Sequence, residues 1–291
     1  MTNRLWWMRA AHPLVSRFPG VFYRAASAIA WFTWMVRRDL RRNLVRNMLP
    51  LCDGDVAAAR RASRRALRHV AQYYVDLGSL SRRDMSNFEA NHLEIFHAER
   101  LQVLSVAGPL VIVSAHTGNA ELAIQALTFR GRPFVALVEA LEPRELAEYM
   151  SKLRASAGGT FHEATIGGVK AMVSALKQGQ IAGVMGDRDI QNTGVCVTFC
   201  GREVKVPRGP WELARRCGAP VLPVFSSRKH GDQFRIDVGE VFTVNQSNDL
   251  ECDIREAAER FTRLLEAHLR RDPGQWTVLE DFWKVHGCGT R

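Results

Sequence analysis

The sequence has few of the patterns that assign an enzyme class directly. Neither Ser114 nor Thr117 lies in a G-x-S-x-G elbow, so a serine nucleophile is not indicated. There is no RNP, zinc-finger or helix-turn-helix signature, and there is no internal repeat or low-complexity segment. These absences weigh against α/β-type serine hydrolases and the common nucleic-acid-binding modules.

Cysteine is also sparse and unpatterned. The six cysteines are scattered over 291 residues without a C-x-x-C pair, and Cys196 and Cys200 are the nearest two, four residues apart. A metal site needs more ligands close together, so we expect no bound metal. We expect the cysteines to be reduced and to pack as small buried hydrophobic residues, as in a protein of a reducing compartment.

Negative charge is deficient relative to positive charge. The chain carries 40 Lys and Arg against 30 Asp and Glu, a net charge of +10. This excess favours an anionic partner, which could be nucleic acid, an anionic membrane surface or a phosphorylated substrate. The hydrophobic fraction of 46% is typical of a packed globular protein.

An aromatic apolar run near the amino terminus, residues 18–36, contains a single charge, Arg24. A bilayer-spanning helix needs about 20 apolar residues, and Pro19, Gly20 and Arg24 interrupt the first part of this run. Arginines flank it on both sides, and Trp31 and Trp34 suit the headgroup level. We therefore expect an interfacial anchor; the alternative is an amphipathic helix packed on the body of the protein.

Two basic helical runs follow, at residues 37–46 and 60–68. Their arginines repeat at i, i+4 spacing, so each helix has a basic face. One such run would be an ordinary solvated face. Two runs beside an aromatic apolar segment favour anionic lipid headgroups, although nucleic acid remains open.

From residue 85 onward, strand and helix patterns alternate. Strands are expected at 110–115, 132–138, 181–186, 195–199, 220–225 and 234–244, the last antiparallel, and Pro223 suggests a sheet-edge or strand-end position. Helices are expected at 120–129, 143–157, 167–178, 209–217 and 254–271. The fold class is thus α/β, with a mostly parallel central sheet flanked by helices. Residues 1–84 form a basic, membrane-associating helical region and residues 85–291 the α/β domain.

The candidate catalytic residue is His116. It follows a buried β-branched strand and precedes a helix, the position where open α/β sheets place their ligands. Glu121 is the other polar group of this turn. On a continuous helix the two would lie about 140° apart, so they can meet only if the turn, helped by Gly118, folds His116 back. A histidine with a carboxylate partner is equipped to act as a general base.

Two further groups of polar residues are expected near His116, at the same edge of the sheet. Asp187, Arg188 and Asp189 end the strand at 181–186, where a salt-bridge cluster is the alternative to a binding role. Arg202, Lys205 and Arg208 precede the helix at 209–217, and a helix amino terminus with nearby cations suits a phosphate or carboxylate. The alternative is a basic loop without a ligand.

Five motifs occur in register. They are H-T-G-N-A-E at 116–121, G-D-R-D at 186–189, G-V-x-V-x-F-x-G-R at 194–202, P-x-G-P-W-E-L-A at 207–214 and G-A-P-V-L-P-V-F at 218–225. With R-R-N-L at 41–44, they resemble the lysophospholipid acyltransferase superfamily, and within it the lipid A biosynthesis (lauroyl/myristoyl) acyltransferase family. W-x-x-L-x-x-x-W at 276–283 and E-x-L-x-P at 139–143 are most similar to its phosphatidylinositol mannoside branch.

The resemblance implies transfer of a fatty acyl group from acyl-CoA or acyl carrier protein to a hydroxyl of a membrane glycolipid or phospholipid. It implies His116 as general base in an HX4E motif, with Glu121 as its orienting partner. It assigns substrate contacts to the following residues: Arg154, Asp187, Arg188, Asp189, Gly201 and Arg208. No metal or resident cofactor is expected beyond the acyl thioester co-substrate. The expected location is the cytoplasmic face of a bacterial inner membrane, with no nucleic-acid partner.

Three alternatives remain open at this point. The protein could be a non-catalytic, anionic lipid-binding protein of the membrane surface, which would use the two arginine runs. It could be a nucleic-acid-binding protein, which would bind in a strongly salt-dependent manner. It could also be a hydrolase, in which water replaces the lipid acceptor.

Overall fold

The computed structural model describes residues 12–120, 122–123, 125, 132–139, 144–155 and 159–289. Its centre is a seven-stranded sheet in the order β1-β9-β8-β2-β5-β3-β4. Every neighbouring pair in this sheet is parallel except β8 and β9. The mostly parallel sheet expected from the sequence is confirmed, and so is the antiparallel pairing expected for the strand that begins at residue 234, which is β9.

The strands of the sheet are β1 (Leu93–Phe96), β2 (Leu110–Ser114), β3 (Phe134–Val138), β4 (Thr160–Glu163), β5 (Ile181–Met185), β8 (Val221–Arg228) and β9 (Phe234–Val238). The helices are α2 (Pro19–Val36), α3 (Arg38–Met48), α4 (Val56–Ser79), α5 (Met85–His92), α7 (Arg144–Ala155), α8 (Ile166–Lys177), α9 (Gly209–Cys217), α10 (Leu250–Arg271) and α11 (Phe282–Val285). Of the helices expected at 120–129 and 143–157, residues 121, 124, 126–129, 143, 156 and 157 lie outside the described residues.

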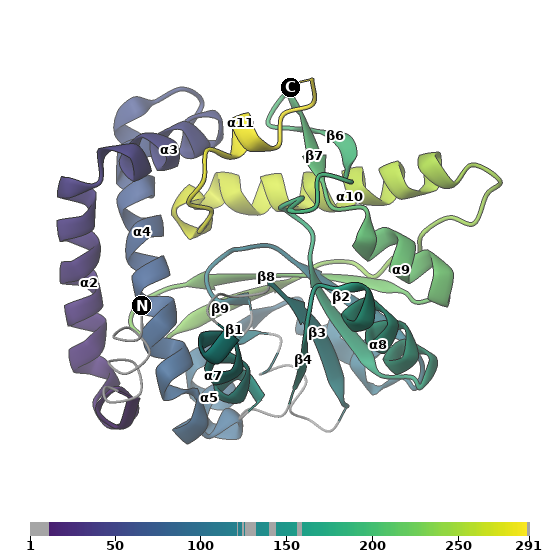
Figure 1. Ribbon diagram of the computed structural model, residues 1–291, viewed down its shortest axis with the longest axis horizontal. Coiled ribbons are helices and arrows are strands. Elements are labelled where there is room, and N and C mark those ends of the chain that lie inside the picture. Colours follow the sequence, from purple (N-terminus) through teal and green to yellow (C-terminus); the bar gives the residue numbers. More distant parts are fainter. Residues whose placement is uncertain are drawn as a thin grey trace.

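Side-chain alternation along β2 divides the core into two layers. Val111 and Val113 belong to the large cluster that includes α9 and α10, whereas Leu110 and Ile112 belong to a second cluster on the other face. All five residues of β2 are buried, which explains its uninterrupted apolar sequence. In Figure 1 the long helix α10 crosses above the sheet, and α2, α3 and α4 stand together on the left.

Helix ends follow ordinary capping chemistry. The Asp55 carboxylate accepts hydrogen bonds from the amides of Ala57 and Ala58 at the start of α4, and Asp249 accepts one from Cys252 at the start of α10. Gly218 ends α9 in the left-handed conformation. The Gly218 cap lies at the boundary expected from the sequence, whereas α10 begins at Leu250, four residues before its expected start at 254.

Helix α2 has two apolar faces. Tyr23, Ala26, Ala30 and Trp34 are buried, and α2 and α4 lie side by side (Figure 1). Ala30 and Trp34 belong to the same core cluster as Val111 of β2. The opposite face of α2 leaves several large apolar side chains exposed, listed here: Phe18, Val21, Ile29, Trp31, Phe32, Met35 and Val36. Among the helices that the structure describes, none has the length and apolar character needed to cross a membrane.

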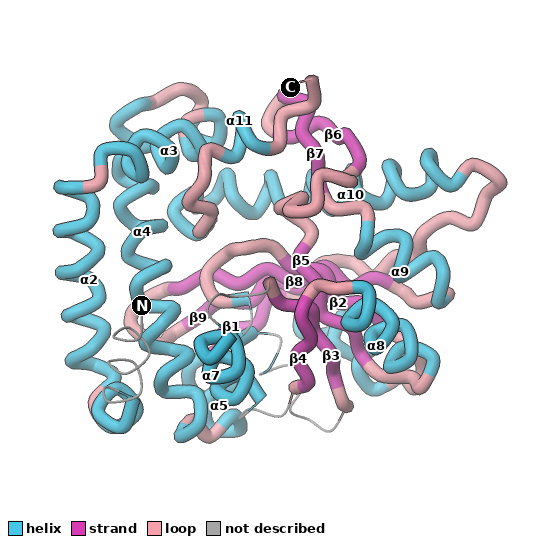
Figure 2. The backbone as a smooth tube through the Cα atoms, in the orientation of Figure 1, coloured by secondary structure: helices cyan, strands magenta, loops and turns pink. Residues whose placement is uncertain are grey.

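Strands β6 (Val195–Phe199) and β7 (Arg202–Val206) form a separate antiparallel hairpin. The chain after α11 runs beside it, with the Lys205 amide donating to the His286 carbonyl and the Cys288 amide to the Glu203 carbonyl. Figure 2 shows this hairpin standing apart from the sheet, next to the C-terminal segment. The C-terminal segment thereby extends the hairpin.

Cys196 and Cys288 form a disulfide across this contact. The expectation that the cysteines are all reduced and buried is therefore wrong for this pair. Cys196 lies on the exposed side of β6, where the C-terminal segment brings Cys288 against it from 92 residues away. The remaining four cysteines are free and partly buried.

Of the two positions expected for Pro223, a sheet edge or a strand end, the edge is wrong, because β8 lies between β9 and β2. Pro223 is the third residue of β8, near the start of the strand. Pro223 is the last residue of β8 that pairs with β2, and the ladder with β9 begins one residue later, at Val224. The Pro223 carbonyl still accepts a hydrogen bond from the Gly239 amide. An amide hydrogen at position 223 would lie beyond the end of the β8–β9 ladder. Its absence therefore breaks no hydrogen bond of that ladder, which explains why an interior strand tolerates the proline.

Candidate active site at the carboxyl end of β2

His116 lies just beyond β2, and its closest polar partner is Asp187, just beyond the neighbouring strand β5. The ring Nδ1 of His116 is 2.8 Å from Oδ1 of Asp187, and the His116 amide donates to Oδ2 of Asp187 at 3.1 Å. β2 and β5 are adjacent and parallel, with Ser114 opposite Met185. The two residues that follow them therefore meet at one edge of the sheet.

Burial separates the two members of this pair. The Asp187 side chain is fully buried, whereas 31% of the His116 side chain is exposed. Burial alone would raise the pKa of the Asp187 carboxyl, but the neighbouring His116 charge and hydrogen bonds from His116 and Trp276 hold this pKa below its ordinary value. The pair thus consists of a buried carboxylate and an accessible imidazole.

The pair has the geometry of a general base. An ionised carboxylate can only accept, so the Nδ1 of His116 donates to it, and the Nε2 carries the lone pair. Nε2 makes no hydrogen bond to any residue that the structure describes. The imidazole can therefore take a proton from a group that approaches its exposed side.

The turn after His116 is tightly held. Gly118 has a φ of +53°, and a Cβ at this position would lie 2.6 Å from the Ser226 carbonyl oxygen. Ser226 of β8 donates from its hydroxyl to the Thr117 carbonyl and accepts from the Asn119 amide. Only glycine fits here, so Gly118 shapes the turn that carries His116, while its expected role in bringing His116 to Glu121 stays a prediction.

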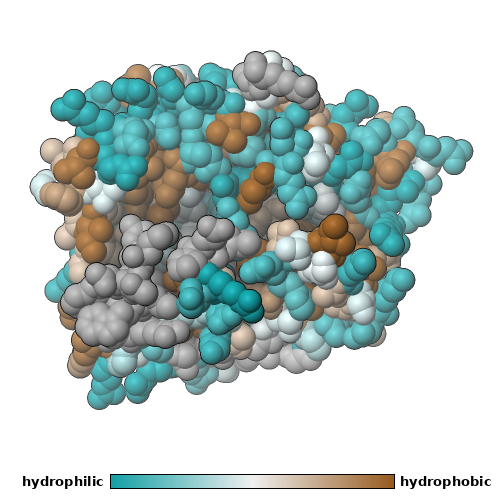
Figure 3. All heavy atoms as spheres, viewed as in Figure 1, coloured by the Kyte–Doolittle hydropathy of each residue, from teal (hydrophilic) through white to brown (hydrophobic). Residues whose placement is uncertain are grey.

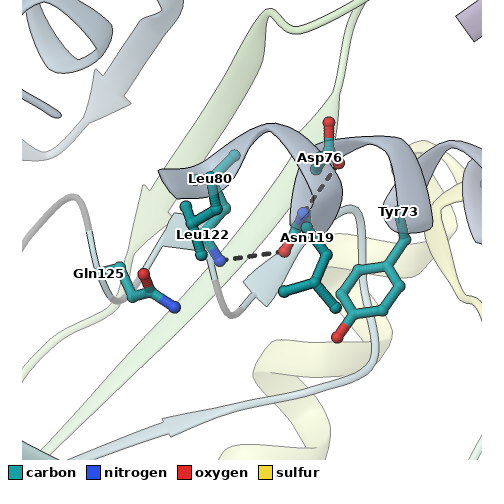
Figure 4. A pocket seen from close by; sticks show the side chains of 7 residues that line it. Tyr73, Asp76, Leu80, Asn119, Leu122 and Gln125 are labelled. Carbon is teal, nitrogen blue, oxygen red and sulfur yellow. Dashed lines mark hydrogen bonds between the residues drawn. The ribbon is translucent and has the colours of Figure 1, made fainter. Parts of the chain in front are cut away.

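Asn119 joins this turn to α4. Its side-chain oxygen accepts from the Leu122 amide and caps the helix that begins at Ala120, while its Nδ2 donates to Asp76 at 2.8 Å. Figure 4 shows Asn119 between Asp76 and Leu122, in the wall of a small pocket that Tyr73 also lines. Helix α4 thus helps to fix the turn that carries His116.

The C-terminal segment holds the same turn from another side. The His116 carbonyl accepts from the amide and the hydroxyl of Thr277, and the Gly118 amide donates to the Gln275 carbonyl. Trp276 between them donates from its indole nitrogen to Asp187 Oδ2 at 3.1 Å. The W-x-x-L-x-x-x-W pattern marked this segment in the sequence, but no role near His116 was expected for it.

Of the other residues expected at the site, those that the structure describes have partners other than His116. Glu121 lies outside the described residues, so its role as orienting partner stays a prediction; the carboxylate that the structure places on Nδ1 is that of Asp187. Arg188 pairs with Glu280 of the C-terminal segment, and Asp189 accepts from the Gly194 amide. Arg154 donates to the Tyr73 hydroxyl. Their contacts with substrate stay predictions.

The two remaining predicted site residues, Gly201 and Arg208, stabilise the structure around β7 and α9. Gly201 has a φ of +72° in the turn between β6 and β7, and Arg208 pairs with both Glu212 and Glu251. The contribution of these two residues to substrate binding also stays a prediction. Within the described part of the chain, no three His, Cys, Asp or Glu side chains are grouped so that they could hold a metal ion.

Two similar proteins carry the same name. Over 181 residues the chain is 29% identical to a phosphatidylinositol mannoside acyltransferase of Mycobacterium tuberculosis (strain ATCC 25618 / H37Rv), covering 60% of this chain and 54% of the relative. Over 224 residues it is 25% identical to the phosphatidylinositol mannoside acyltransferase of Mycolicibacterium smegmatis, covering 76% of this chain and 71% of the relative. The match thus spans about half the length of the Mycobacterium tuberculosis protein.

A solved structure, the 1-acyl-sn-glycerophosphate acyltransferase of Thermotoga maritima, aligns with 89% of this chain and 98% of its own, at 14% identity and a TM-score of 0.38. The family model for bacterial lipid A biosynthesis acyltransferases matches residues 2–285, which is nearly the whole chain. The family expected from the sequence motifs is therefore confirmed. The chain belongs to the bacterial lipid A biosynthesis acyltransferase family.

Proposed function

We propose that this protein transfers a fatty acyl group from a thioester to a hydroxyl of a membrane glycolipid of the phosphatidylinositol mannoside or lipid A precursor type. The observation that carries the proposal is the accessible imidazole of His116, held on Nδ1 by the buried carboxylate of Asp187. The family membership and the names of the relatives support the same reaction class.

In the proposed reaction, Nε2 of His116 removes the proton of the acceptor hydroxyl as its oxygen attacks the thioester carbonyl carbon. The C–S bond then breaks, the acceptor keeps the acyl group as an ester, and the thiolate takes the proton from the imidazolium. A positioned base of this kind contributes typically about 10² to 10⁴-fold to the rate. Asp187 stabilises the imidazolium during the reaction, because it stays ionised beside it.

The donor in this proposal is acyl-CoA or acyl carrier protein. Acyl-CoA and acylated acyl carrier protein are cytoplasmic thioesters, whereas the acceptor is embedded in a bilayer. The enzyme would therefore work at the cytoplasmic face of the bacterial inner membrane. Helix α2 suits this location, because its outward face exposes Trp31 and Phe32 at 66% and 61%. Brown, apolar side chains follow the left margin of Figure 3, where α2 lies.

Exposed arginines lie on the two helices that follow α2 in the chain. Arg38 and Arg42 of α3, and Arg60, Arg64 and Arg68 of α4, are exposed. Each arginine near an anionic surface contributes about 1 kcal/mol to binding. We therefore place the outward face of α2 and these arginines against anionic lipid headgroups, as an interfacial contact.

The membrane contact is tested by flotation with vesicles. The Ile29→Glu/Phe32→Glu double variant should lose binding to phosphatidylglycerol vesicles, while Leu250→Glu, at an exposed apolar position that begins α10, should retain it. Wild-type binding should weaken on phosphatidylcholine vesicles, which lack the negative charge. Equal binding by both variants would refute this assignment for α2.

The catalytic proposal is tested with His116→Ala and, as a control, His97→Ala at a half-exposed histidine beyond β1. Each variant is incubated with long-chain acyl-CoA or acylated acyl carrier protein and with phosphatidylinositol mannoside or lipid A precursor. The ester product is measured by mass spectrometry. We expect His116→Ala to lose product at least about 100-fold while His97→Ala remains active. Retained turnover in His116→Ala would exclude the proposed base.

The same assay separates the alternatives. A non-catalytic protein that only binds anionic lipid through the arginines of α3 and α4 would consume no thioester under any condition. A hydrolase would release free fatty acid without added lipid acceptor. Thioester consumption that depends on the added lipid acceptor supports only the acyltransferase hypothesis.

A further inference from the structure

The residues 275–277 run antiparallel to the turn that carries His116. Thr117 forms an antiparallel bridge with Trp276. The Thr277 amide and hydroxyl donate to the His116 carbonyl at 2.8 and 2.9 Å, and the Gly118 amide donates to the Gln275 carbonyl at 3.0 Å. The C-terminal segment therefore fixes the backbone on both sides of Thr117.

The indole of Trp276 reaches from this segment to the carboxylate behind His116. Its Nε1 donates to Asp187 Oδ2 at 3.1 Å, and the side chain is fully buried. Phe282 and Phe199 pack edge-on against it, with ring centroids 4.7 and 5.6 Å away. The direction of the indole N–H is thus set by an aromatic cluster that the active site does not otherwise use.

Asp187 Oδ2 accepts from two donors, the His116 amide and the Trp276 indole, whereas Oδ1 faces the His116 ring. Without the indole, the carboxylate would have a single backbone donor to hold its orientation. The direction of Oδ1 determines where the imidazole points. A donor that fixes Oδ2 therefore also fixes the base.

We propose that Trp276 is a positioning residue for acyl transfer, which orients the Asp187 carboxylate and, through it, the His116 imidazole. The inference rests on the proposed role of His116 as general base. Trp276 acts through Asp187 and contacts no reacting atom. Its removal should therefore change the rate and its pH dependence more than the binding of substrates.

The sign of the pH effect follows from the hydrogen bond. A donor to a carboxylate stabilises the charged form, so loss of the indole makes Asp187 more basic. A more basic carboxylate holds the protonated imidazole more strongly, and the acid limb of the pH–rate profile then moves to higher pH. Other nearby charges are committed elsewhere: Arg188 pairs with Glu280, which also faces His286, and Asp189 accepts from Gly194.

The test compares Trp276→Phe with Trp283→Phe. Trp283 belongs to the same aromatic cluster, but its indole donates to the backbone carbonyls of Arg46 and Asn47. We expect Trp276→Phe to lower kcat at pH 7 about tenfold, equal to about 1.4 kcal/mol, with little change in KM. The acid limb should move to higher pH, so that the loss shrinks as the pH rises. Trp283→Phe should keep the wild-type profile.

His116→Ala is assayed in parallel to separate two kinds of failure. If His116→Ala is inactive and Trp276→Phe shows a wild-type profile, or a loss that is the same at every pH, the positioning role is refuted and the base stands. If His116→Ala keeps activity, the proposed function itself fails. Should Trp276→Phe not fold, benzothienylalanine at position 276 replaces only the indole N–H by sulfur, and the same shift is expected.

Discussion

Arg228 of β8 and Asp76 of α4 form an ion pair in which both side chains are 1% exposed. The Asp76 carboxylate also accepts hydrogen bonds from the Tyr23 hydroxyl and the Asn119 side chain. Burial, followed by the Asp76 charge, raises the pKa of Tyr23, so Tyr23 keeps its proton and donates. One buried carboxylate therefore joins α2, the central sheet and the turn that carries His116.

Replacement of Asp76 by Asn should destabilise the protein strongly. The change leaves the Arg228 charge buried without its counter-charge, which typically costs about 3–5 kcal/mol. We expect the midpoint of urea unfolding to fall accordingly. Arg144→Met is the matched control, because it breaks a pair with Glu148 whose side chains are 89% and 57% exposed; exposed pairs contribute at most about 1 kcal/mol. Equal stability of the two variants would contradict the importance of the buried pair.

Asp187→Asn should leave the fold largely intact and lower activity at least about 100-fold. The amide keeps the size of the side chain, but it no longer stabilises the imidazolium and can present its NH₂ group to Nδ1, which favours the unproductive tautomer. Steady-state kinetics and circular dichroism measure the two effects separately. Asp249→Asn is the control, since Asp249 caps α10, where asparagine caps equally well, and makes no hydrogen bond to His116. An active Asp187→Asn variant would mean that another carboxylate orients the base.

Much of the fold could be predicted from the sequence because its central strands are buried on both faces. β2 and β5 read as short apolar runs for this reason. The sequence did not reveal β7 of the hairpin, nor two strands of the central sheet, β1 and β4, which lie at its two edges. Each has four residues, none of them fully buried, so neither produces an apolar run.

The site could be predicted only in part, because strand order is not readable from one chain. His116 and Asp187 were both expected at strand ends, but their contact depends on β5 lying beside β2. Trp276 reaches Asp187 from 89 residues away, on the segment between the short 3-10 helix Pro273–Gln275 and α11. The Cys196–Cys288 disulfide likewise depends on where the C-terminal segment crosses the β6–β7 hairpin.

Loss of this disulfide should lower stability. It closes a loop with a sequence separation of 92 residues, and removal of a cross-link of this kind typically costs about 2–4 kcal/mol. Cys288→Ser should therefore unfold at lower urea concentration, and so should the wild type after reduction. Cys252→Ser is the control, because Cys252 is a free cysteine in the first turn of α10. If thiol trapping at lysis finds Cys196 and Cys288 reduced, the cross-link does not form in the cell.

Acid should destabilise the protein through His69 of α4. The ring Nδ1 of His69 lies 3.0 Å from the Gly274 carbonyl, directly before Gln275. Burial, followed by the nearby positive charges of Arg228 and Arg68, lowers the pKa of His69 to about 3. The unfolded chain, with an ordinary histidine pKa of about 6.5, then binds more protons than the folded one between these values. The contribution of neutral His69 to the free energy of unfolding is fully present above about pH 6.5 and is lost as the pH falls toward 3.

His69→Gln should reduce this slope, because glutamine can still donate to the Gly274 carbonyl but does not titrate. The free energy of urea unfolding, measured at pH 7, 5.5 and 4.5, should fall less in the variant than in the wild type. His97→Gln, at a half-exposed histidine, should retain the wild-type slope. Because His69 holds the backbone next to the segment that carries Trp276, acid should also loosen the support of His116. An unchanged slope in His69→Gln would show that other groups cause the acid sensitivity.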